Sequence, residues 1–416
     1  MSNISQRAQI LIGTPSPLVD AHFEAEADPY HPQNNPKGAI NLGTAENHLM
    51  DQESLARVTQ PFALNKHYLH YAEFRGIHSL RKRIALFLEQ VSFIKEVSPN
   101  NIVIGNGVSS LLESLAYTLF DEGDAVLIPS PCYSGYHDDF SARFGVKIIT
   151  APMSLDNDFA LDMDIIKRRY KEAVADGEQI KALLINSPNN PLGHVYSEKV
   201  LTEAVKFAQE NDLQIISDEI YTHSVFEGSR AGSLLEIGKE YRHSIHMLYG
   251  MAKDFGLSGF KFGFVYSENS KLIQAMSANA YFYNVSTYTQ AVVEQLFTDI
   301  ASTRQFLKLY KQRLGKAYQH FQACNQATLD APYIPAQGGH FVFINLGAFL
   351  SENTFEAEML LFENIWESGR VNITPGQFFA CPTPGWFRLC FANEAVLVSE
   401  AFFRLKKLLI KGALSK

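Results

Sequence analysis

The stretch that decides the fold is residues 182–221, which read ALLINSPNNPLGHVYSEKVLTEAVKFAQENDLQIISDEIY. A short apolar run, Ala182–Ile185, is followed by a polar loop, a helical stretch at Ser197–Gln209 and a second apolar run at Gln214–Ile216. Strand, helix and strand in this order predict a crossover connection between parallel strands. Because each apolar run ends in polar residues, we expect functional side chains beyond the carboxyl ends of these strands.

The same alternation extends in both directions along the chain. Further strand-sized apolar runs lie at Ile102–Ile104, Ala125–Ile128, Val146–Ile149, Ile245–Tyr249 and Phe262–Tyr266, with helical stretches between most of them. The sequence therefore predicts an α/β fold with a mostly parallel, seven-stranded sheet that is covered by helices on both faces.

After about residue 300 the pattern changes. A long polar helix at Thr303–Ala323 leads to two further strands and helices, which predict a smaller α+β domain. A polar, proline-punctuated segment at 28–38 predicts an irregular N-terminal arm. We therefore expect residues 1–60 to form this arm and part of the small domain, 61–305 the large domain, and 306–416 the rest of the small domain.

Composition and charge exclude several classes of protein. The 416 residues carry 36 Lys and Arg against 44 Asp and Glu, so no overall positive field exists to hold a nucleic acid. No apolar run approaches the roughly 18–20 residues needed to cross a membrane, and we see no signal peptide. The four cysteines form no C-x-x-C pair, which is typical of reduced thiols in a cytoplasmic protein, and the scattered histidines predict no metal site.

Two of the strand-end loops have features of a cofactor site. Residues 106–110, Asn-Gly-Val-Ser-Ser, precede a helical stretch at Leu111–Leu119. Glycine and hydroxyl residues at a helix N-terminus offer free N–H donors to a phosphate, although a plain helix cap has the same composition. Two prolines stiffen the turn that presents Tyr133, whose ring either stacks on a flat cofactor or packs within the turn.

The next two strand ends carry an amide and a carboxylate. Asn190 lies in the loop Asn186–Gly193, where two X-Pro steps favour extended backbone; the amide either donates to a ring oxygen or belongs to an ordinary loop. Asp218 follows Gln214–Ile216, and a carboxylate at the end of a buried strand is costly unless it is paired. It is well placed to hold a protonated ring nitrogen, with Tyr221 beside it.

A lysine and an arginine complete the set. Lys253 follows the strand Ile245–Tyr249 among small residues. A lysine in a crowded, partly desolvated site loses its proton more readily and becomes a nucleophilic amine, whereas a lysine at the surface stays a solvated cation. Arg388 stands in an otherwise apolar strand, which implies an anionic partner: either a carboxylate of a substrate or a structural ion pair.

In this order, the residues resemble the fold-type-I pyridoxal-5′-phosphate (PLP) enzymes, specifically the class I and II aminotransferases, over nearly the whole chain. Within that superfamily, Asn35–Asn47 and Pro384–Arg388 look like motifs of the 1-aminocyclopropane-1-carboxylate (ACC) synthases and ACC-synthase-like proteins. Tyr71–Gly76 is nearer the ACC-synthase-like branch, because this chain has Phe74 and Arg75 where plant ACC synthases typically have Tyr and His.

The resemblance implies a role for each residue. Lys253 would hold PLP through a Schiff base and shuttle the proton at the substrate α-carbon, while Asp218 would keep the pyridine nitrogen protonated. The other implied contacts are Asn190 and Tyr221 with the ring oxygen, Tyr133 with the ring face, Val108, Ser109 and Lys261 with the phosphate, Tyr71 with the phosphate of a neighbouring subunit, Arg388 with the substrate α-carboxylate, and Glu46 with the substrate. The role of Tyr71 implies a homodimer.

Three departures from the family pattern concern the cofactor site. Gly250 and Ala252 stand where the family often has serines before the lysine, and Ser187 replaces the first Asn of an N-P-x-N-P motif. Lys261 stands where the family has a phosphate-binding arginine, so a charge survives but the bidentate fork does not. We expect a weaker grip on the phosphate in a site that still works.

The resemblance leaves three functions open. The first is an aminotransferase that moves the amino group of an L-amino acid to a 2-oxo acid. The second is an elimination or cyclisation, as ACC synthase performs on S-adenosylmethionine; Glu46 favours it, unless that carboxylate only caps or pairs locally, and Phe74 disfavours it. The third is a non-catalytic PLP-fold interaction protein, which Gly250 and Lys261 motivate.

Overall fold

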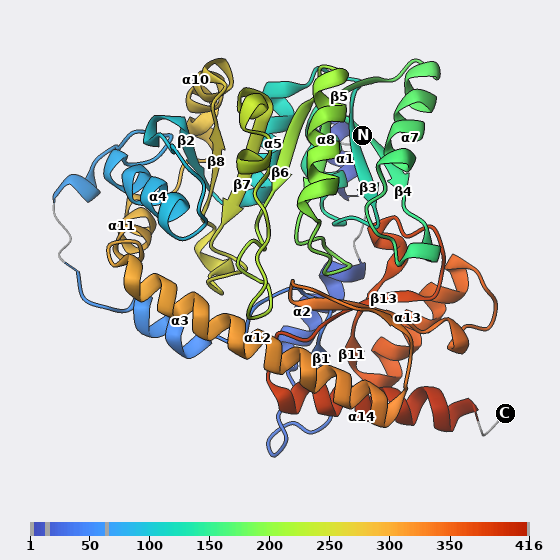
Figure 1. The fold of residues 1–416 in the computed structure, drawn as a ribbon. Coiled ribbons are helices and arrows are strands. Elements are labelled where there is room, and N and C mark those ends of the chain that lie inside the picture. The colour runs from blue at the N-terminus through green and yellow to red at the C-terminus, as the bar shows by residue number, and fades with distance from the viewer. Residues whose placement is uncertain (1–3, 13–16, 63–65, 414–416) are drawn as a thin grey trace.

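The computed structural model describes residues 4–12, 17–62 and 66–413, and its largest sheet has seven strands in the order β2-β8-β7-β6-β5-β3-β4 (Figure 1). The strands are β2 (Ile102–Gly105), β3 (Asp124–Ser130), β4 (Lys147–Pro152), β5 (Gln179–Asn186), β6 (Gln214–Asp218), β7 (Ile245–Gly250) and β8 (Gly263–Ser267). Strand β8 pairs antiparallel with both β2 and β7, and the other four strand pairs of this sheet are parallel. The predicted α/β fold with a mostly parallel seven-stranded sheet is confirmed.

The two faces of this sheet are buried by different helices. In β5, Leu183 and Ile185 belong to one apolar core, whereas Ala182 and Leu184 belong to another, as the alternation of side chains along a strand requires. The first core includes α4 (His78–Gln90), α7 (Met163–Ala175), α8 (Glu198–Glu210) and α9 (Leu234–Ile237), and the second includes α5 (Val108–Leu119), α6 (Tyr136–Phe144) and α10 (Ser270–Asn279). Burial on both faces explains why the strands are continuous apolar runs.

Residues from both ends of the chain build the second part of the molecule. Its antiparallel sheet has the order β12-β13-β10-β9, and β1 (Ile40–Asn41) pairs in parallel with β11 (Val371–Asn372). The remaining strands are β9 (Tyr333–Ile334), β10 (Phe341–Asn345), β12 (Thr374–Pro375) and β13 (Trp386–Cys390), and the helices are α12 (Ile300–Thr328), α13 (Phe355–Gly369) and α14 (Ala395–Ala413). The expected domain boundary at residue 305 falls inside α12, which runs beneath the large sheet and on towards α14 (Figure 1).

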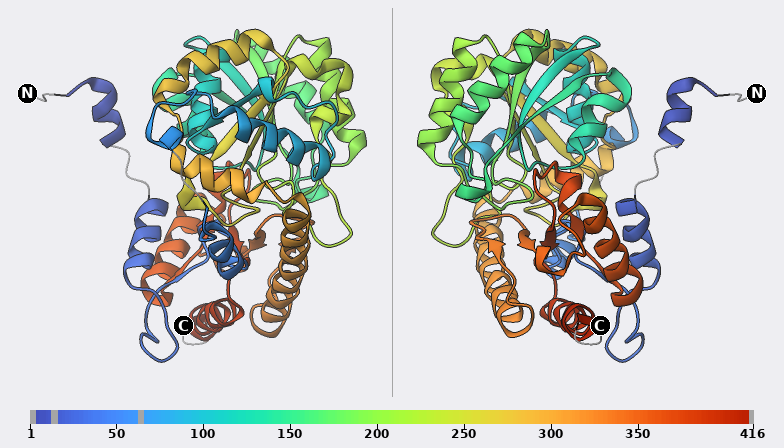
Figure 2. Two further views of the ribbon diagram at one scale, coloured as in Figure 1. Left: turned by 90° about the vertical axis from the view of Figure 1, so that its left-hand side faces the viewer. Right: turned by 90° about the vertical axis from the view of Figure 1, so that its right-hand side faces the viewer.

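The N-terminal segment contains two helices that the sequence pattern did not predict. Helix α1 (Gln6–Ile12) stands away from the body of the molecule, whereas α2 (Pro17–Ala27) packs against β1 and β11 (Figure 2). The apolar face of α2 is weak, because only Ala21 and Ala25 are buried. Two more helices, α3 (Asp51–Val58) and α11 (Thr287–Leu296), lie beside α4 and α12. Within the described ranges, no helix is long and apolar enough to span a membrane.

Candidate active site

Polar side chains from both parts of the molecule meet in one cavity of about 600 Å³. Its lining comes from the carboxyl ends of β5 and β6, the segment after β7, the first turn of α5, residues 43–46, helix α2 and strands β12 and β13. Every predicted site residue except Tyr71 lines this cavity. These are Glu46, Val108, Ser109, Tyr133, Asn190, Asp218, Tyr221, Lys253, Lys261 and Arg388.

Lys253 faces this cavity from the loop after β7. Its Nζ donates to the carbonyl oxygen of Ala45 at 2.7 Å, and its own carbonyl accepts from Asn47 Nδ2 at 3.0 Å. Burial, followed by the positive charge of Arg388, lowers the pKa of Lys253 from 10.5 to about 8. A substantial fraction of the amine is therefore neutral near physiological pH, which is the state that a nucleophilic lysine requires.

Asp218 is buried at the end of β6 and has a hydrogen-bond partner that the sequence analysis missed. Tyr136 Oη donates to Asp218 Oδ2 at 2.7 Å, and the N–H of Ile220 donates to Oδ1 at 3.2 Å. Burial raises the pKa of Asp218, while these two donors and Lys253 lower it. The only signal for Tyr136 in the sequence is its position three residues after Tyr133, at the start of α6.

Arg388 is a buried cation without an anionic partner among the described residues. Its Nη1 donates to Asn190 Oδ1 at 3.0 Å and its Nη2 donates to the carbonyl of Gly43, while Nε has no hydrogen-bond partner. The guanidinium lies 4.8 Å from the ring centroid of Phe379. A buried charge without a counter-ion is costly, so this arrangement fits an anionic ligand rather than a structural ion pair.

The predicted phosphate end of the cavity lies at the N-terminus of α5. Gly107 precedes it with φ of 88°, and the first N–H groups of the helix have no partner within the helix. A Cβ built on Gly107 would lie 3.7 Å from Lys261 Cε, so that lysine is close to this turn. A Cβ on Gly250 would lie 3.0 Å from Val108 Cγ2, so the valine methyl limits the space where the family often has serine.

A partly buried carboxyl group beside this turn was also missed by the sequence analysis. Asp139 in α6 has a buried Oδ2 without a partner among the described residues. Burial raises the pKa of Asp139 to about 8, although its hydrogen bond with Ser109 lowers it. At neutral pH this group is therefore mostly protonated and adds little negative charge next to a bound phosphate.

The two predicted ring contacts, Tyr133 and Tyr221, are held in aromatic clusters. Tyr133 packs edge-to-face against Tyr136 with ring centroids 5.2 Å apart, and Tyr221 packs edge-to-face against His340 and Phe341, each at 5.3 Å. Burial raises the pKa of Tyr133 to about 12 and that of Tyr221 well above its usual range. Both hydroxyls therefore stay protonated and available as donors.

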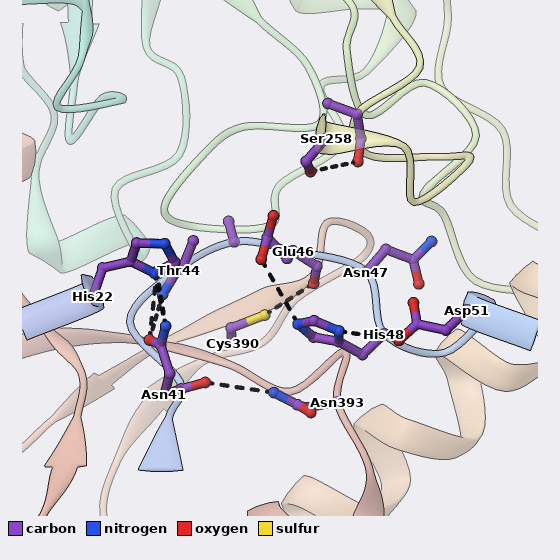
Figure 3. Close-up of polar contacts among 12 residues, drawn as sticks. His22, Asn41, Thr44, Glu46, Asn47, His48, Asp51, Ser258, Cys390 and Asn393 are labelled. Atoms are coloured by element: carbon purple, nitrogen blue, oxygen red, sulfur yellow. Dashed lines mark hydrogen bonds and ion pairs between the residues drawn. The ribbon is translucent and has the colours of Figure 1, made fainter. Parts of the chain in front are cut away.

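Glu46 enters the cavity from the loop after β1 and also has a local partner (Figure 3). Its Oε2 lies 3.8 Å from His48 Nε2, and His48 Nδ1 lies 3.3 Å from Asp51 Oδ2.

His22 of α2 also lines the cavity, and its Nδ1 lies 2.9 Å from both Asn41 Nδ2 and Thr44 Oγ1 (Figure 3). Sequence reasoning missed His22, because α2 has little amphipathic pattern.

Tyr71 is the one predicted site residue that lies apart. It is 95% exposed and lines a separate hollow with Phe74 and Thr287. Its ring packs edge-to-face on Phe74, whose ring packs in turn on Tyr281. The expected contact of Tyr71 with a phosphate needs a second copy of the chain and stays a prediction.

The fold and this cavity are those expected of a PLP-dependent enzyme, and comparison with known proteins places the chain in a family. Residues 37–399 match the family described as aminotransferase class I and II. The chain is 32% identical over 396 residues to 1-aminocyclopropane-1-carboxylate synthase 1 of Cucurbita pepo, covering 92% of this chain and 80% of that protein. The chain therefore belongs to the class I and II aminotransferase family, whose members are PLP-dependent.

A second relative and a solved structure are also similar to this chain. A Mus musculus protein named "probable inactive 1-aminocyclopropane-1-carboxylate synthase-like protein 2" is 37% identical over 398 residues, covering 92% of this chain and 68% of that protein. The structure of Thermus thermophilus aspartate aminotransferase with maleate has a TM-score of 0.81 at 22% identity, covering 98% of this chain and 100% of that one. The second likeness concerns the fold alone.

The residues of this cavity fit PLP by their own chemistry. They offer a lysine with a lowered pKa, helix N–H donors and a cation for a phosphate, and a buried carboxylate for a ring nitrogen. The unpartnered Nε of Arg388 and its lack of a carboxylate leave a place for the carboxylate of an amino acid. The replacements Lys261 and Gly250 change the phosphate end without closing it.

Proposed function

We propose that the protein is an aminotransferase that moves the amino group of an L-amino acid to a 2-oxo acid. The observation that carries this proposal is the convergence of Lys253, Asp218 and Arg388 on one cavity, with the lysine amine lowered in pKa and the arginine unpaired. PLP bound there would supply an electron-withdrawing ring that stabilises negative charge at the substrate α-carbon.

Side chains of this protein bind the substrate, transfer the proton and hold the cofactor. Arg388 binds the substrate α-carboxylate and orients the α-carbon, while Asn190, whose Oδ1 accepts from Arg388, keeps its role at the ring oxygen. Lys253 Nζ removes the α-proton and returns a proton later, which its lowered pKa allows. Asp218, steadied by Tyr136, holds the proton on the ring nitrogen, and α5 with Lys261 anchors the phosphate. We further propose a cytoplasmic homodimer in which Tyr71 reaches the site of the partner subunit.

A second candidate, the ACC-synthase-type elimination or cyclisation, is favoured by Glu46. Its carboxylate lines the cavity, where it would attract a substrate with a cationic side chain such as S-adenosylmethionine. A third candidate is a non-catalytic PLP-fold interaction protein. It is supported by Lys261 and Gly250, and by the mouse relative, whose name includes the words "probable inactive".

One spectroscopic experiment separates the three candidates. The purified protein is loaded with PLP, and its absorbance is followed while single L-amino acids, and then S-adenosylmethionine, are added. Conversion to pyridoxamine phosphate with one amino acid, reversed by a 2-oxo acid, supports transamination. Turnover of S-adenosylmethionine without pyridoxamine phosphate supports the second candidate. Failure to bind PLP contradicts both enzymatic proposals and leaves the third.

A further inference from the structure

Helix α2 forms one wall of the cavity, and no role proposed above uses it. Four residues of this helix line the cavity: Leu18, Val19, His22 and Phe23. Val19 is 50% exposed and Phe23 is 65% exposed, and because they are four residues apart they form one apolar patch on the helix. Apolar surface that stays in contact with water at a cavity favours a ligand whose own apolar group covers it.

This wall lies next to Arg388. The carbonyl of Gly43 accepts from Arg388 Nη2, and the next residue, Thr44, has its Oγ1 2.9 Å from Nδ1 of His22. Two consecutive residues therefore join α2 to the guanidinium that is free to bind a carboxylate. The rest of a ligand bound by that guanidinium has the patch of Val19 and Phe23 within its reach.

His22, the polar residue of this wall, already has a hydrogen-bond donor on Nδ1. The amide of Asn41 is oriented by its Oδ1, which accepts from the N–H groups of Gly43 at 3.2 Å and Thr44 at 3.3 Å. Its Nδ2 therefore donates to His22 Nδ1 at 2.9 Å, because an amide nitrogen cannot accept. A proton on Nδ1 would break that hydrogen bond, so the ring offers a single N–H to a ligand rather than a cation.

The cavity has no cation left for a second carboxylate. Among the described residues that line it, the lysines and arginines are Lys253, Lys261 and Arg388, and the proposed function assigns each of them to the cofactor or the α-carboxylate. The hollow around Tyr71, which the proposed homodimer would bring to this site, is likewise lined by no lysine or arginine within the described ranges. Glu46 lines the cavity and repels an acidic side chain.

We propose that the substrate of this site has an apolar side chain that packs against Val19 and Phe23 of α2, and that the cavity discriminates against acidic amino acids. The inference rests on the proposed function, because it takes Arg388 as the group that binds the α-carboxylate. It names the class of the substrate and makes α2 a specificity-determining element. Burial of apolar surface favours one kind of side chain, and an unpaired charge disfavours the other.

Unreactive carboxylates test this inference without any turnover. Dissociation constants are measured by calorimetry with PLP-loaded protein for three probes: 3-phenylpropanoate, glutarate and 5-aminopentanoate, which carry an aromatic ring, a second carboxylate and an ammonium group. We expect 3-phenylpropanoate to bind at least about tenfold more tightly than either of the others. Tighter binding of glutarate or of 5-aminopentanoate would overturn the inference. Failure of all three to bind would also overturn it, since Arg388 would then capture no carboxylate.

Phe23→Arg sharpens the test, because it supplies the missing cation at an exposed position where folding should not suffer. We expect this variant to bind glutarate about tenfold more tightly than the wild-type protein does, and 3-phenylpropanoate about tenfold more weakly. Phe403→Arg, at a 60% exposed position on α14, is the matched control for net charge and should leave both constants unchanged. Unchanged constants in Phe23→Arg, or equal changes in the two variants, would show that α2 does not set the preference.

The same titrations separate this inference from the proposed function. They are repeated with apo protein, which keeps both Arg388 and α2, so the measurement does not depend on PLP binding. If 3-phenylpropanoate binds most tightly but no amino acid yields pyridoxamine phosphate, the inference about α2 stands and the aminotransferase proposal fails. If an acidic amino acid is transaminated most efficiently, the proposed function stands and this inference fails.

Discussion

The two ends of the cavity differ in how far they depart from the family pattern. At one end, Lys253, Asp218 and Arg388 all keep the residue types of the family. At the other end, around the N-terminus of α5, Lys261 stands where the resemblance implies an arginine, and Gly250, beside Val108, stands where it implies a serine. The same chain has therefore kept one set of residues and changed the other.

The difference follows from how many groups share each task. A phosphate at a helix N-terminus is held by several N–H groups, hydroxyls and a cation, so the loss of one donor is spread over the rest. The amine, the ring-nitrogen carboxylate and the carboxylate-binding guanidinium each act alone, and no neighbour can replace them. We therefore expect substitutions at the first end to cost more than substitutions at the second.

The largest effect should come from Lys253→Ala. We expect this variant to lose the absorbance of lysine-bound PLP and to lower kcat by at least about 10⁴-fold, because both the covalent anchor and the proton carrier are gone. Lys271→Ala, at an exposed position on α10, is the matched control and should leave both unchanged. A Lys253→Ala protein with wild-type kcat would remove the lysine from the mechanism.

The same lysine predicts a pH dependence. An amine reacts when it is neutral, so capture of PLP by the apo protein should accelerate as the pH rises and level off above about 8, the lowered pKa of Lys253. A capture rate that keeps rising towards pH 10.5, the unperturbed value, would show that burial does not act on this amine.

Arg388→Met should have the next largest effect, and it should lower activity while it raises stability. Arg388→Met should lower kcat/KM by about 10²-fold or more, because the substrate carboxylate loses its charged donor. The same change should raise the free energy of unfolding of the apo protein by about 1 kcal/mol, since it removes a buried charge without a counter-ion. Arg242→Met is the control: Arg242 is also buried but pairs with Glu268 at 2.9 Å, so its loss should destabilise the protein.

Tyr136→Phe should have a smaller effect at the same end of the cavity. Without the 2.7 Å hydrogen bond, the pKa of Asp218 rises and its hold on the ring nitrogen weakens, so we expect kcat to fall by about tenfold. Tyr283→Phe is a matched control, because that buried hydroxyl also donates a hydrogen bond, to the carbonyl of Met276 at 2.6 Å. Equal kcat in the two variants would show that Tyr136 serves stability alone.

Much of the fold and of the site could be predicted from the sequence, and the exceptions have physical causes. The strands of the large sheet are continuous apolar runs, so their polar ends at Asn190, Asp218 and Lys253 were visible. Tyr136 and His22 were not, because each depends on a partner distant in the chain, Asp218 in one case and Asn41 in the other. No local pattern marks a side chain whose role is set by such a contact.

The smallest effects should come from the phosphate end, where Val108 and Gly250 form a compensated pair. Gly250→Ser places a Cβ 3.0 Å from Val108 Cγ2, and overpacking of this kind should weaken PLP binding by about fivefold. Val108→Ala removes the methyl groups that crowd that position but leaves the backbone oxygen of Phe262 3.1 Å from the new Cβ, so the double variant should bind PLP more tightly than Gly250→Ser alone. The four dissociation constants form a double-mutant cycle, and its coupling term tests the pairing directly. Strictly additive changes would mean that the two positions changed independently, and that redundancy among the phosphate donors alone explains why this end of the cavity tolerates them.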